Sequence, residues 1–152
     1  MEKQKDVFEL DMFDTTTEVR IKYGSYNHNG TLALMMLCRP DEYEEGYYSQ
    51  FGRSSEGPYV SPYGVATVNL QESDMLPVDE QFVDENNMPG IGKWLQENGI
   101  AQPTGKLACS GFCCYEAYRF NAPKEELQKI EAARLEISGK NGESRSAAPK
   151  LR

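Results

Sequence analysis

The sequence predicts an α+β fold: an antiparallel sheet of about five strands, one packed helix at 87–98, a second, marginal helix at 122–137, and a disordered C-terminal tail. Three observations predict it. Short runs of alternating or continuous apolar residues recur between residues 7 and 120, as they do in strands. Residues 87–98 instead have helical apolar spacing between start and stop signals. The last residues are polar and have no hydrophobic period.

The length of 152 residues suits a single domain. We place that domain at 1–121, with a long loop rich in tyrosine and acidic residues at 39–64, and assign 122–152 to the polar helix and tail. No stretch approaches the ~20 apolar residues that cross a bilayer, and the N-terminus MEKQKDVFELD lacks the apolar core of a signal peptide. We therefore expect a cytoplasmic protein without disulfides. The glycosylation sequon Asn29-Gly30-Thr31 is then a chance match.

The first strands are predicted from alternation. VFELDMF, residues 7–13, has the pattern of an edge strand or a short arm. In EVRIKYGSY, Val19, Ile21 and Tyr23 alternate with basic residues, as in a half-buried strand. NHNG then provides a tight turn because Asn-Gly tolerates positive φ, and TLALMMLC has the continuous apolar character of a strand covered on both faces. Residues 18–38 therefore predict a β-hairpin.

The middle of the chain is less regular. Residues 39–64 contain repeated prolines and glycines and resist assignment to one strand or one helix. VATVNL resumes the sheet at 65–70, QESDMLPVDE is a loop, and QFVDE is a short strand or extended piece. Residues 39–64 are therefore predicted as a turn-rich loop between two strands.

The segment NNMPGIGKWLQENG predicts a helix. Asn86 or Asn87 is placed to cap its N-terminus, and Pro89 suits the first turn, where its missing N–H is not needed. Gly99 is a C-terminal stop. The large apolar residues fall on one face at helical spacing: Ile91, Trp94 and Leu95. The tryptophan among them is expected to anchor the core.

The remaining segments follow that helix. After a turn at 103–105, the stretch GKLACSGFCCYEAYRF is predicted to be a strand from about Lys106 to Phe120, continuous or broken near Gly111. Asn121 with Pro123 starts the helix of KEELQKIEAARLEI. Its apolar stripe is thin: Leu127, Ile130 and Ile137. From 138 onward, SGKNGESRSAAPKLR is expected to be disordered.

The cysteines of this stretch decide between a reactive site and a packed strand. Cys109 and Cys113 would share a face of a continuous strand but lie ~13 Å apart at ~3.3 Å per residue, and Cys114 would point to the opposite face. A structural zinc site needs its ligands close together, which only a sharp loop at Gly111 would achieve. We therefore predict that the cysteines pack as small hydrophobic residues in a core strand, with no metal site.

Other candidates for catalysis are few. His28, the only histidine, lies in the predicted hairpin turn, where we expect it to be solvated rather than paired with a thiol. GIAQPTGKL departs from the spacing of a phosphate loop. Asp84 is placed to help cap the helix. The acid pairs are expected to be solvated because no apolar sequence flanks them: Asp41, Glu42, Glu44 and Glu45; Asp79 and Glu80; Asp84 and Glu85. We predict no enzyme, no catalytic residue and no cofactor.

Charge is concentrated in the first half of the chain. Residues 1–80 carry 15 acidic and 6 basic residues, a net charge of −9, whereas residues 81–152 carry 9 and 10, a net charge of +1. The total of −8 argues against a nucleic-acid binder, which needs a basic face. A negative field favours basic partners, and acidity also keeps a small protein soluble.

The acidic half contains one segment, DEYEEGYYSQFG, that mixes carboxylates with aromatic side chains. Tyrosine is frequent in recognition surfaces, and neighbouring carboxylates would pair with Arg or Lys of a basic partner, in imitation of nucleic-acid phosphate. The alternative of equal weight is a loop that packs a few tyrosines on the sheet edge. The predicted partner-binding residues are Asp41, Glu42, Tyr43, Glu44, Glu45, Tyr47, Tyr48 and Phe51.

Three segments follow one another in a distinctive order: GSYNHNGTLALMML, YGVATVNL and FVDENNMPGIGKWLQENGIAQPTGKLACSGFCCYEAYRF, all within residues 18–120. Together they resemble a family of small proteins carried on conjugative transposons and plasmids of gut bacteria, domain of unknown function 4313. The loop at 39–64 looks like an expansion, and the chain after 121 lies outside the resemblance. The resemblance implies a mobile genetic element and no established enzyme activity, so no catalytic residue is carried over.

These observations predict a non-enzymatic, acidic binding protein of a bacterial mobile element. Its expected partner is a basic host protein that handles nucleic acid, such as a CRISPR effector or a restriction nuclease. The protein would inhibit this partner by occupying its basic surface, without binding nucleic acid or a membrane itself. Two alternatives remain: a conjugation accessory protein that binds transfer machinery, and a small thiol or metal enzyme.

Overall fold

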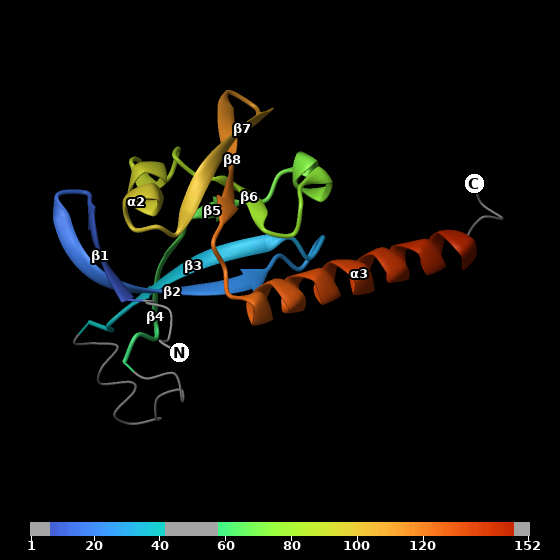
Figure 1. The fold of residues 1–152 in the computed structure, drawn as a ribbon, viewed down its shortest axis with the longest axis horizontal. Coiled ribbons are helices and arrows are strands. Elements are labelled where there is room, and N and C mark those ends of the chain that lie inside the picture. Colours follow the sequence, from blue (N-terminus) through green and yellow to red (C-terminus); the bar gives the residue numbers. More distant parts are fainter. Residues whose placement is uncertain (1–6, 42–57, 148–152) are drawn as a thin grey trace.

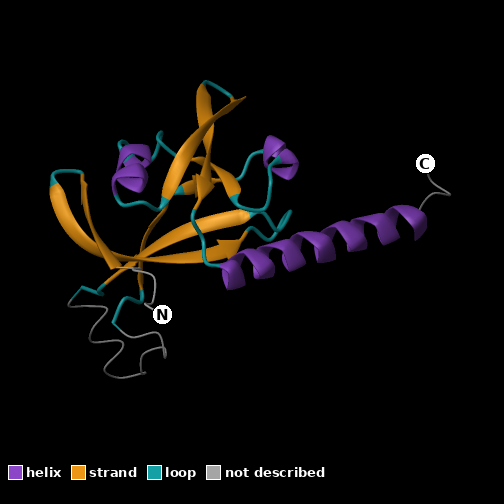
Figure 2. Ribbon diagram, viewed as in Figure 1, coloured by secondary structure: helices purple, strands orange, loops and turns teal. Residues whose placement is uncertain are grey.

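The computed structural model describes residues 7–41 and 58–147, with side chains up to residue 139. Within these residues the protein has two antiparallel sheets of four strands each, in the orders β1-β2-β3-β4 and β5-β6-β8-β7, together with two α-helices (Figures 1 and 2). The predicted α+β class is confirmed. The strands, however, form two sheets where the sequence predicted one sheet of about five.

The first sheet consists of β1 (Val7–Met12), β2 (Thr15–Ser25), β3 (Leu32–Cys38) and β4 (Ser61–Val65). In β1, which is an edge strand, Phe8, Leu10 and Met12 are buried, and the residues between them face outward. The long strand β2 pairs with β1 through its first half and with β3 through its second half. The hairpin predicted at 18–38 is therefore present, and β2 begins earlier than predicted.

The second sheet consists of β5 (Thr67–Val68), β6 (Glu80–Val83), β7 (Ala101–Ser110) and β8 (Cys113–Phe120). The chain passes between the sheets at Ala66. Its N–H donates to the carbonyl of Leu34 at 2.9 Å, and its own carbonyl accepts from the N–H of Asp84 at 2.8 Å. The strand predicted at 65–70 is consequently divided between two sheets.

The stretch predicted as a strand from Lys106 to Phe120 is a hairpin made of β7 and β8. Gly111 adopts a φ of 63°, which a glycine does without steric cost, and the chain reverses there. The turn predicted at 103–105 lies inside β7 as an irregularity, with a register shift between Pro103 and Leu107. Gly105, at a φ of 86°, accommodates this shift.

Helix α2 spans Ile91–Glu97 and is shorter than the predicted helix at 87–98. Its N-cap residue is Gly90, not Asn86 or Asn87. The carboxylate of Glu85 accepts hydrogen bonds from the N–H of Gly90 at 2.8 Å and from the N–H of Gly92 at 2.6 Å. Negative charge is favourable at a helix N-terminus, so Glu85 replaces the predicted asparagine cap.

Trp94 anchors α2 to the first sheet, as predicted. It is 8% exposed, and its ring meets Phe8 edge-on with 5.8 Å between the ring centroids. Its Nε1–H donates to the carbonyl of Glu9 at 2.7 Å. The helix ends before Gly99, which has a φ of 69° and matches the predicted C-terminal stop.

Helix α3 spans Lys124–Ala147 and extends well beyond the sheets (Figure 1). Ile130 is fully buried in the core, Leu127 packs beside it, and Leu135 is exposed. Gly30 lies so close to the helix that a Cβ at this position would be 2.8 Å from the backbone nitrogen of Arg134. The helix continues past the predicted end at 137, and the remainder of the predicted tail, 148–152, lies outside the described residues.

A buried polar network joins the two sheets. Gln81 is fully buried; its Nε2 donates to Thr31 Oγ1 at 3.0 Å and to the carbonyl of Leu32 at 2.9 Å. Its Oε1 accepts from Ser73 Oγ at 2.6 Å, in a short 3-10 helix (Gln71–Met75) where a loop was predicted. Thr31 in turn donates to Asn29 Oδ1 at 2.8 Å. Asn29 and Thr31 of the sequon thus act as structural residues.

Candidate functional site

Only one residue of the predicted partner-binding set is described. Asp41 is exposed and follows the end of β3. The others lie outside the described residues: Glu42, Tyr43, Glu44, Glu45, Tyr47, Tyr48 and Phe51. The residues that flank 42–57 on either side are, however, described.

The chain on either side of 42–57 meets at β2, around Glu18. Arg39 Nε lies 3.9 Å from Glu18 Oε1, and the Arg39 guanidinium carbon lies 5.1 Å from the centroid of the Tyr59 ring. The hydroxyl of Tyr59 donates to the same Glu18 carboxylate, and this hydrogen bond raises the pKa of Tyr59. The acidic segment therefore emerges beside the β1–β2 hairpin.

The outward face of that hairpin is itself acidic. Glu9 stands directly opposite Glu18 in the register of β1 and β2, and Asp11 stands opposite Thr16, whose hydroxyl donates to it. We call the exposed set Glu9, Asp11, Asp14 and Glu18 the acidic ribbon. Directly opposed like charges destabilise a sheet. The repulsion between Glu9 and Glu18 is unfavourable, and Arg39, beside Glu18, offsets part of it.

The acidic ribbon was not predicted from the sequence. A signal for it was present in VFELDMF, because Glu9 and Asp11 occupy the polar positions of a period-two pattern. The position of Glu9 opposite Glu18, and of Asp11 opposite Thr16, depends on the strand register, which the turn at residues 13–14 determines.

The turn between β1 and β2 is strained. Phe13 has a φ of 55° and Asp14 a φ of 63°, a conformation that costs phenylalanine roughly 1–2 kcal/mol and that aspartate adopts more readily. Phe13 is also 69% exposed. A strained backbone that carries an exposed aromatic side chain is a frequent property of functional sites.

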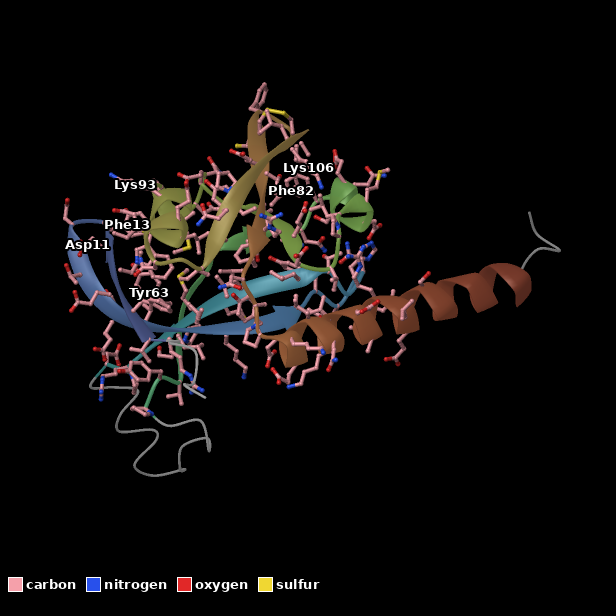
Figure 3. All side chains as sticks on the ribbon, viewed as in Figure 1. Asp11, Phe13, Tyr63, Phe82, Lys93 and Lys106 are labelled. Atoms are coloured by element: carbon pink, nitrogen blue, oxygen red, sulfur yellow. A yellow bond between two sulfur atoms is a disulfide. The ribbon has the colours of Figure 1, made fainter. Side chains whose placement is uncertain are left out.

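Phe13 stands at the edge of a hollow of about 460 Å³, a volume typical of ligand sites. Figure 3 shows Phe13, Tyr63 and Asp11 in this part of the molecule. Burial raises the pKa of Tyr63, whose hydroxyl is also hydrogen-bonded to Thr17. The residues that line the hollow are Phe13, Tyr63, Gly64, Val65, Asp84, Asn87 and Met88. It therefore combines aromatic walls with one carboxylate.

Two carboxylates that were expected to be solvated are buried. Glu80 is 8% exposed and Asp84 is 7% exposed. Glu80 Oε1 lies 2.8 Å from the Nζ of Lys106. Asp84 does not cap α2 as predicted; its carboxylate accepts from the backbone N–H of Asn87 at 3.1 Å and from the Nδ2 of Asn87 at 2.8 Å. Both lie close in the chain to the apolar pair Phe82-Val83 of the buried strand β6, and the tertiary contacts of that strand bury them.

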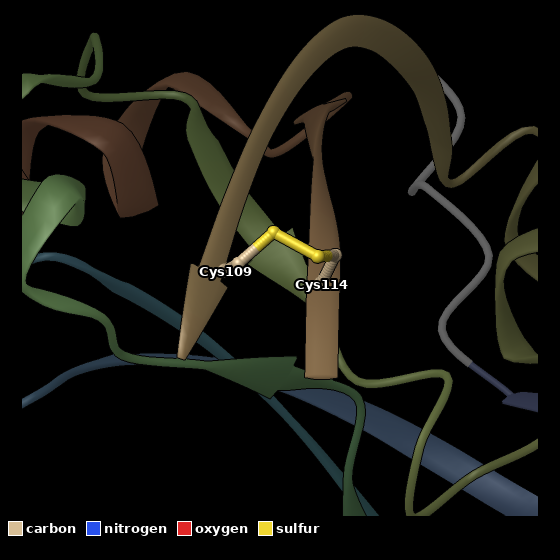
Figure 4. Close-up of a disulfide and its surroundings, with 2 residues drawn as sticks. All are labelled: Cys109 and Cys114. Atoms are coloured by element: carbon tan, nitrogen blue, oxygen red, sulfur yellow. A yellow bond between two sulfur atoms is a disulfide. The ribbon is translucent and has the colours of Figure 1, made fainter. Parts of the chain in front are cut away.

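The cysteine prediction is corrected. Cys109 and Cys114 form a disulfide across the β7–β8 hairpin (Figure 4), and both are exposed rather than packed in a core strand. The turn at Gly111 places them opposite one another, which a continuous strand would not do. Cys113 is a half-buried thiol, and Cys38 takes no part in the disulfide.

The described residues contain no group of three or more His, Cys, Asp and Glu side chains arranged to hold a metal ion. His28 lies exposed in the turn at 27–29, as predicted. Among the helices of the described part, none is long and apolar enough to cross a membrane.

The comparison with protein families matches residues 46–138 to Domain of unknown function (DUF4313). The chain belongs to this family. No curated protein and no solved structure matches it. The match begins after the motif GSYNHNGTLALMML and reaches into helix α3. The family region thus includes most of the loop that looked like an expansion, and it extends beyond the predicted limit at 121.

Proposed function

We propose that this DUF4313 protein is a non-enzymatic binding protein of a bacterial mobile genetic element. In this proposal it inhibits a host defence enzyme that handles nucleic acid, of the CRISPR-effector or restriction type, by occupying the basic surface that normally contacts phosphate. Its carboxylates take the place of phosphates toward Arg and Lys of the partner.

The observation that carries the proposal is the pairing of Glu9 with Glu18 at the root of the acidic segment. Opposed like charges remain in a structure at a cost in stability, and a basic partner removes that cost on binding. The acidic ribbon lies beside Arg39 and Tyr59, which flank residues 42–57, and its carboxylates create a negative field. Such a field raises the rate of encounter with a basic protein and weakens with salt.

The test is capture of a basic partner from host lysate by two variants of equal charge. The triple variant Glu9→Gln, Asp11→Asn, Glu18→Gln removes three charges of the acidic ribbon. The control variant Glu97→Gln, Glu125→Gln, Glu131→Gln removes three exposed charges from α2 and α3. We expect the ribbon variant to lose capture and the control to retain it. Equal capture by both variants would show that the ribbon is not the binding surface.

The same experiment separates the leading function from a conjugation accessory. A captured nuclease whose activity falls on addition of the protein supports inhibition of host defence. Capture of a relaxase or a coupling protein, without any effect on a nuclease, contradicts it and favours the accessory role.

A further inference from the structure

The two buried carboxylates of the described residues, Glu80 and Asp84, differ in how their charge is compensated. Glu80 is paired with Lys106 at 2.8 Å. Asp84 is as deeply buried, and its hydrogen-bond donors are the two N–H groups of Asn87. Of the residues that the structure describes, no basic side chain forms an ion pair with Asp84. A buried charge without an opposite charge is unfavourable, so Asp84 is a site at which a cation would be stabilised.

The hollow beside Phe13 leads to Asp84. Phe13 and Val65 are exposed and form its rim, whereas Asp84 and Met88 are buried and form its deeper part. The carboxylate oxygens of Asp84 each accept one hydrogen bond from Asn87, and a carboxylate oxygen has capacity for a second. The hollow is therefore bordered by a buried carboxylate residue, Asp84, and by two aromatic residues, Phe13 and Tyr63.

We propose that this hollow binds an arginine side chain of a basic protein partner, with the guanidinium against Asp84 and the aliphatic stem against Phe13, Tyr63 and Met88. Arginine fits better than lysine because its planar group stacks on aromatic rings and reaches a carboxylate with two N–H groups at once. Asp14 follows Phe13 in the chain, and Asp11 lies near Phe13 (Figure 3). These charges attract a cation and repel an anionic ligand.

The strained turn supports this assignment. A residue that adopts a positive φ more readily than phenylalanine would relieve the strain at position 13. The large aromatic side chain at the rim of the hollow is therefore present at a cost, as expected of a side chain that contacts a partner.

This inference deepens the proposed function. It rests on that proposal for one point, that the arginine belongs to a basic partner protein. The binding itself is tested on the full-length protein by NMR titration with the peptide acetyl-Gly-Arg-Gly-amide, with the lysine peptide and the citrulline peptide for comparison. We expect the arginine peptide to shift the resonances of Phe13, Tyr63 and Met88. Citrulline has the shape of arginine without its charge, and we expect about tenfold weaker binding. Equal binding of the arginine and citrulline peptides, or shifts confined to other surfaces, would overturn the proposal.

Two variants and one matched control locate the site. Phe13→Asn keeps a residue that tolerates the left-handed turn and removes the ring; we expect about fivefold weaker binding of the arginine peptide. Asp84→Asn removes the charge, with an expected loss of about tenfold. Asp84→Asn also disturbs the contact with Asn87 and could prevent folding. In that case the test of the proposal is Phe13→Asn, because Phe13 is exposed. Phe112→Ser removes the fully exposed ring of the other hairpin and should leave binding unchanged.

Failure of the inference and failure of the proposed function give different results. Suppose that lysate capture is the same for the ribbon variant and its control, while peptide binding still requires Phe13. The proposed function is then wrong, and the arginine specificity of the hollow stands. Suppose instead that capture depends on the ribbon, while Phe13→Asn changes neither capture nor peptide binding. The acidic surface then works without the hollow, and the inference is wrong.

Discussion

The hairpins β1–β2 and β7–β8 both end in an exposed phenylalanine, but they are built differently. The β7–β8 tip turns at Gly111 and is closed by the disulfide between Cys109 and Cys114. The β1–β2 tip turns at Phe13 and Asp14, two residues for which a positive φ is unfavourable. Its ring stands over a hollow, whereas the ring of Phe112 is fully exposed.

The difference shows where the molecule retains an unfavourable local structure. The β7–β8 tip is stabilised by residues close together in the chain, namely Gly111 and the disulfide between Cys109 and Cys114. The β1–β2 tip combines backbone strain with the opposed carboxylates Glu9 and Glu18 and must be stabilised by the rest of the fold. Trp94 provides that support, because it contacts Phe8 and donates to the carbonyl of Glu9. The β1–β2 side is therefore the part of the molecule for which we propose a function.

The largest expected effect tests that support. Trp94→Ala removes a buried aromatic ring and its hydrogen bond to β1, and we expect it to lower the free energy of unfolding by about 3–5 kcal/mol, measured by urea titration. Amide exchange should accelerate more in β1 and β2 than in β7 and β8. Lys93→Ala, at the exposed neighbouring position, is the control and should change stability by less than about 0.5 kcal/mol. Equal acceleration in both hairpins would break the comparison.

An intermediate effect is expected at the other hairpin. The double variant Cys109→Ser, Cys114→Ser opens a short covalent loop, and the chain-entropy relation predicts a loss of about 2 kcal/mol in the free energy of unfolding. A reducing agent should produce the same loss in the unmodified protein. The single variant Cys113→Ser, which leaves the disulfide intact, should differ little from the parent. If the parent contains no disulfide by mass spectrometry of the intact protein, the assignment of covalent stability to this hairpin fails.

The smallest effect has the opposite sign. Phe13→Asn relieves the left-handed strain of the β1–β2 turn, and we expect a gain of about 1 kcal/mol in the free energy of unfolding. Phe112→Ser should stay within about 0.5 kcal/mol of the parent. A variant that is more stable and binds arginine more weakly would show that the strain serves binding. Loss of stability in Phe13→Asn would instead show that the ring contributes to the core.

Local signals predicted much of the fold. The alternation in β1, the Asn-Gly turn between β2 and β3, and the stop at Gly99 all depend on residues close together in the chain, and the structure confirms them. Trp94 was recognised as an anchor because a large aromatic residue on an apolar helix face is seldom exposed. Its partner Glu9, whose carbonyl accepts the indole N–H, was not predicted, since 85 positions separate the two residues.

The candidate site was predicted less well. The acidic half of the chain was recognised from composition, but the ribbon requires the register of β1 against β2. Asp84 was interpreted as a solvated acid or a helix cap. Its burial depends on strands distant in the chain, and such burial is difficult to predict from the neighbouring residues. The cysteines were misjudged for a related reason: one glycine at 111 decides between a strand and a hairpin, and the sequence allowed both.

The sequence by itself determined the α+β class, the position of several strands along the chain, the tryptophan-anchored helix and the excess of negative charge, because periodicity, turn chemistry and composition are local or additive properties. The tertiary structure alone decided that the strands divide into two sheets at Ala66, that Cys109 faces Cys114, and that Asp84 lines one hollow with Phe13 and Tyr63. These features depend on which distant segments meet, and that choice is made by the packing of the whole chain rather than by any segment of it.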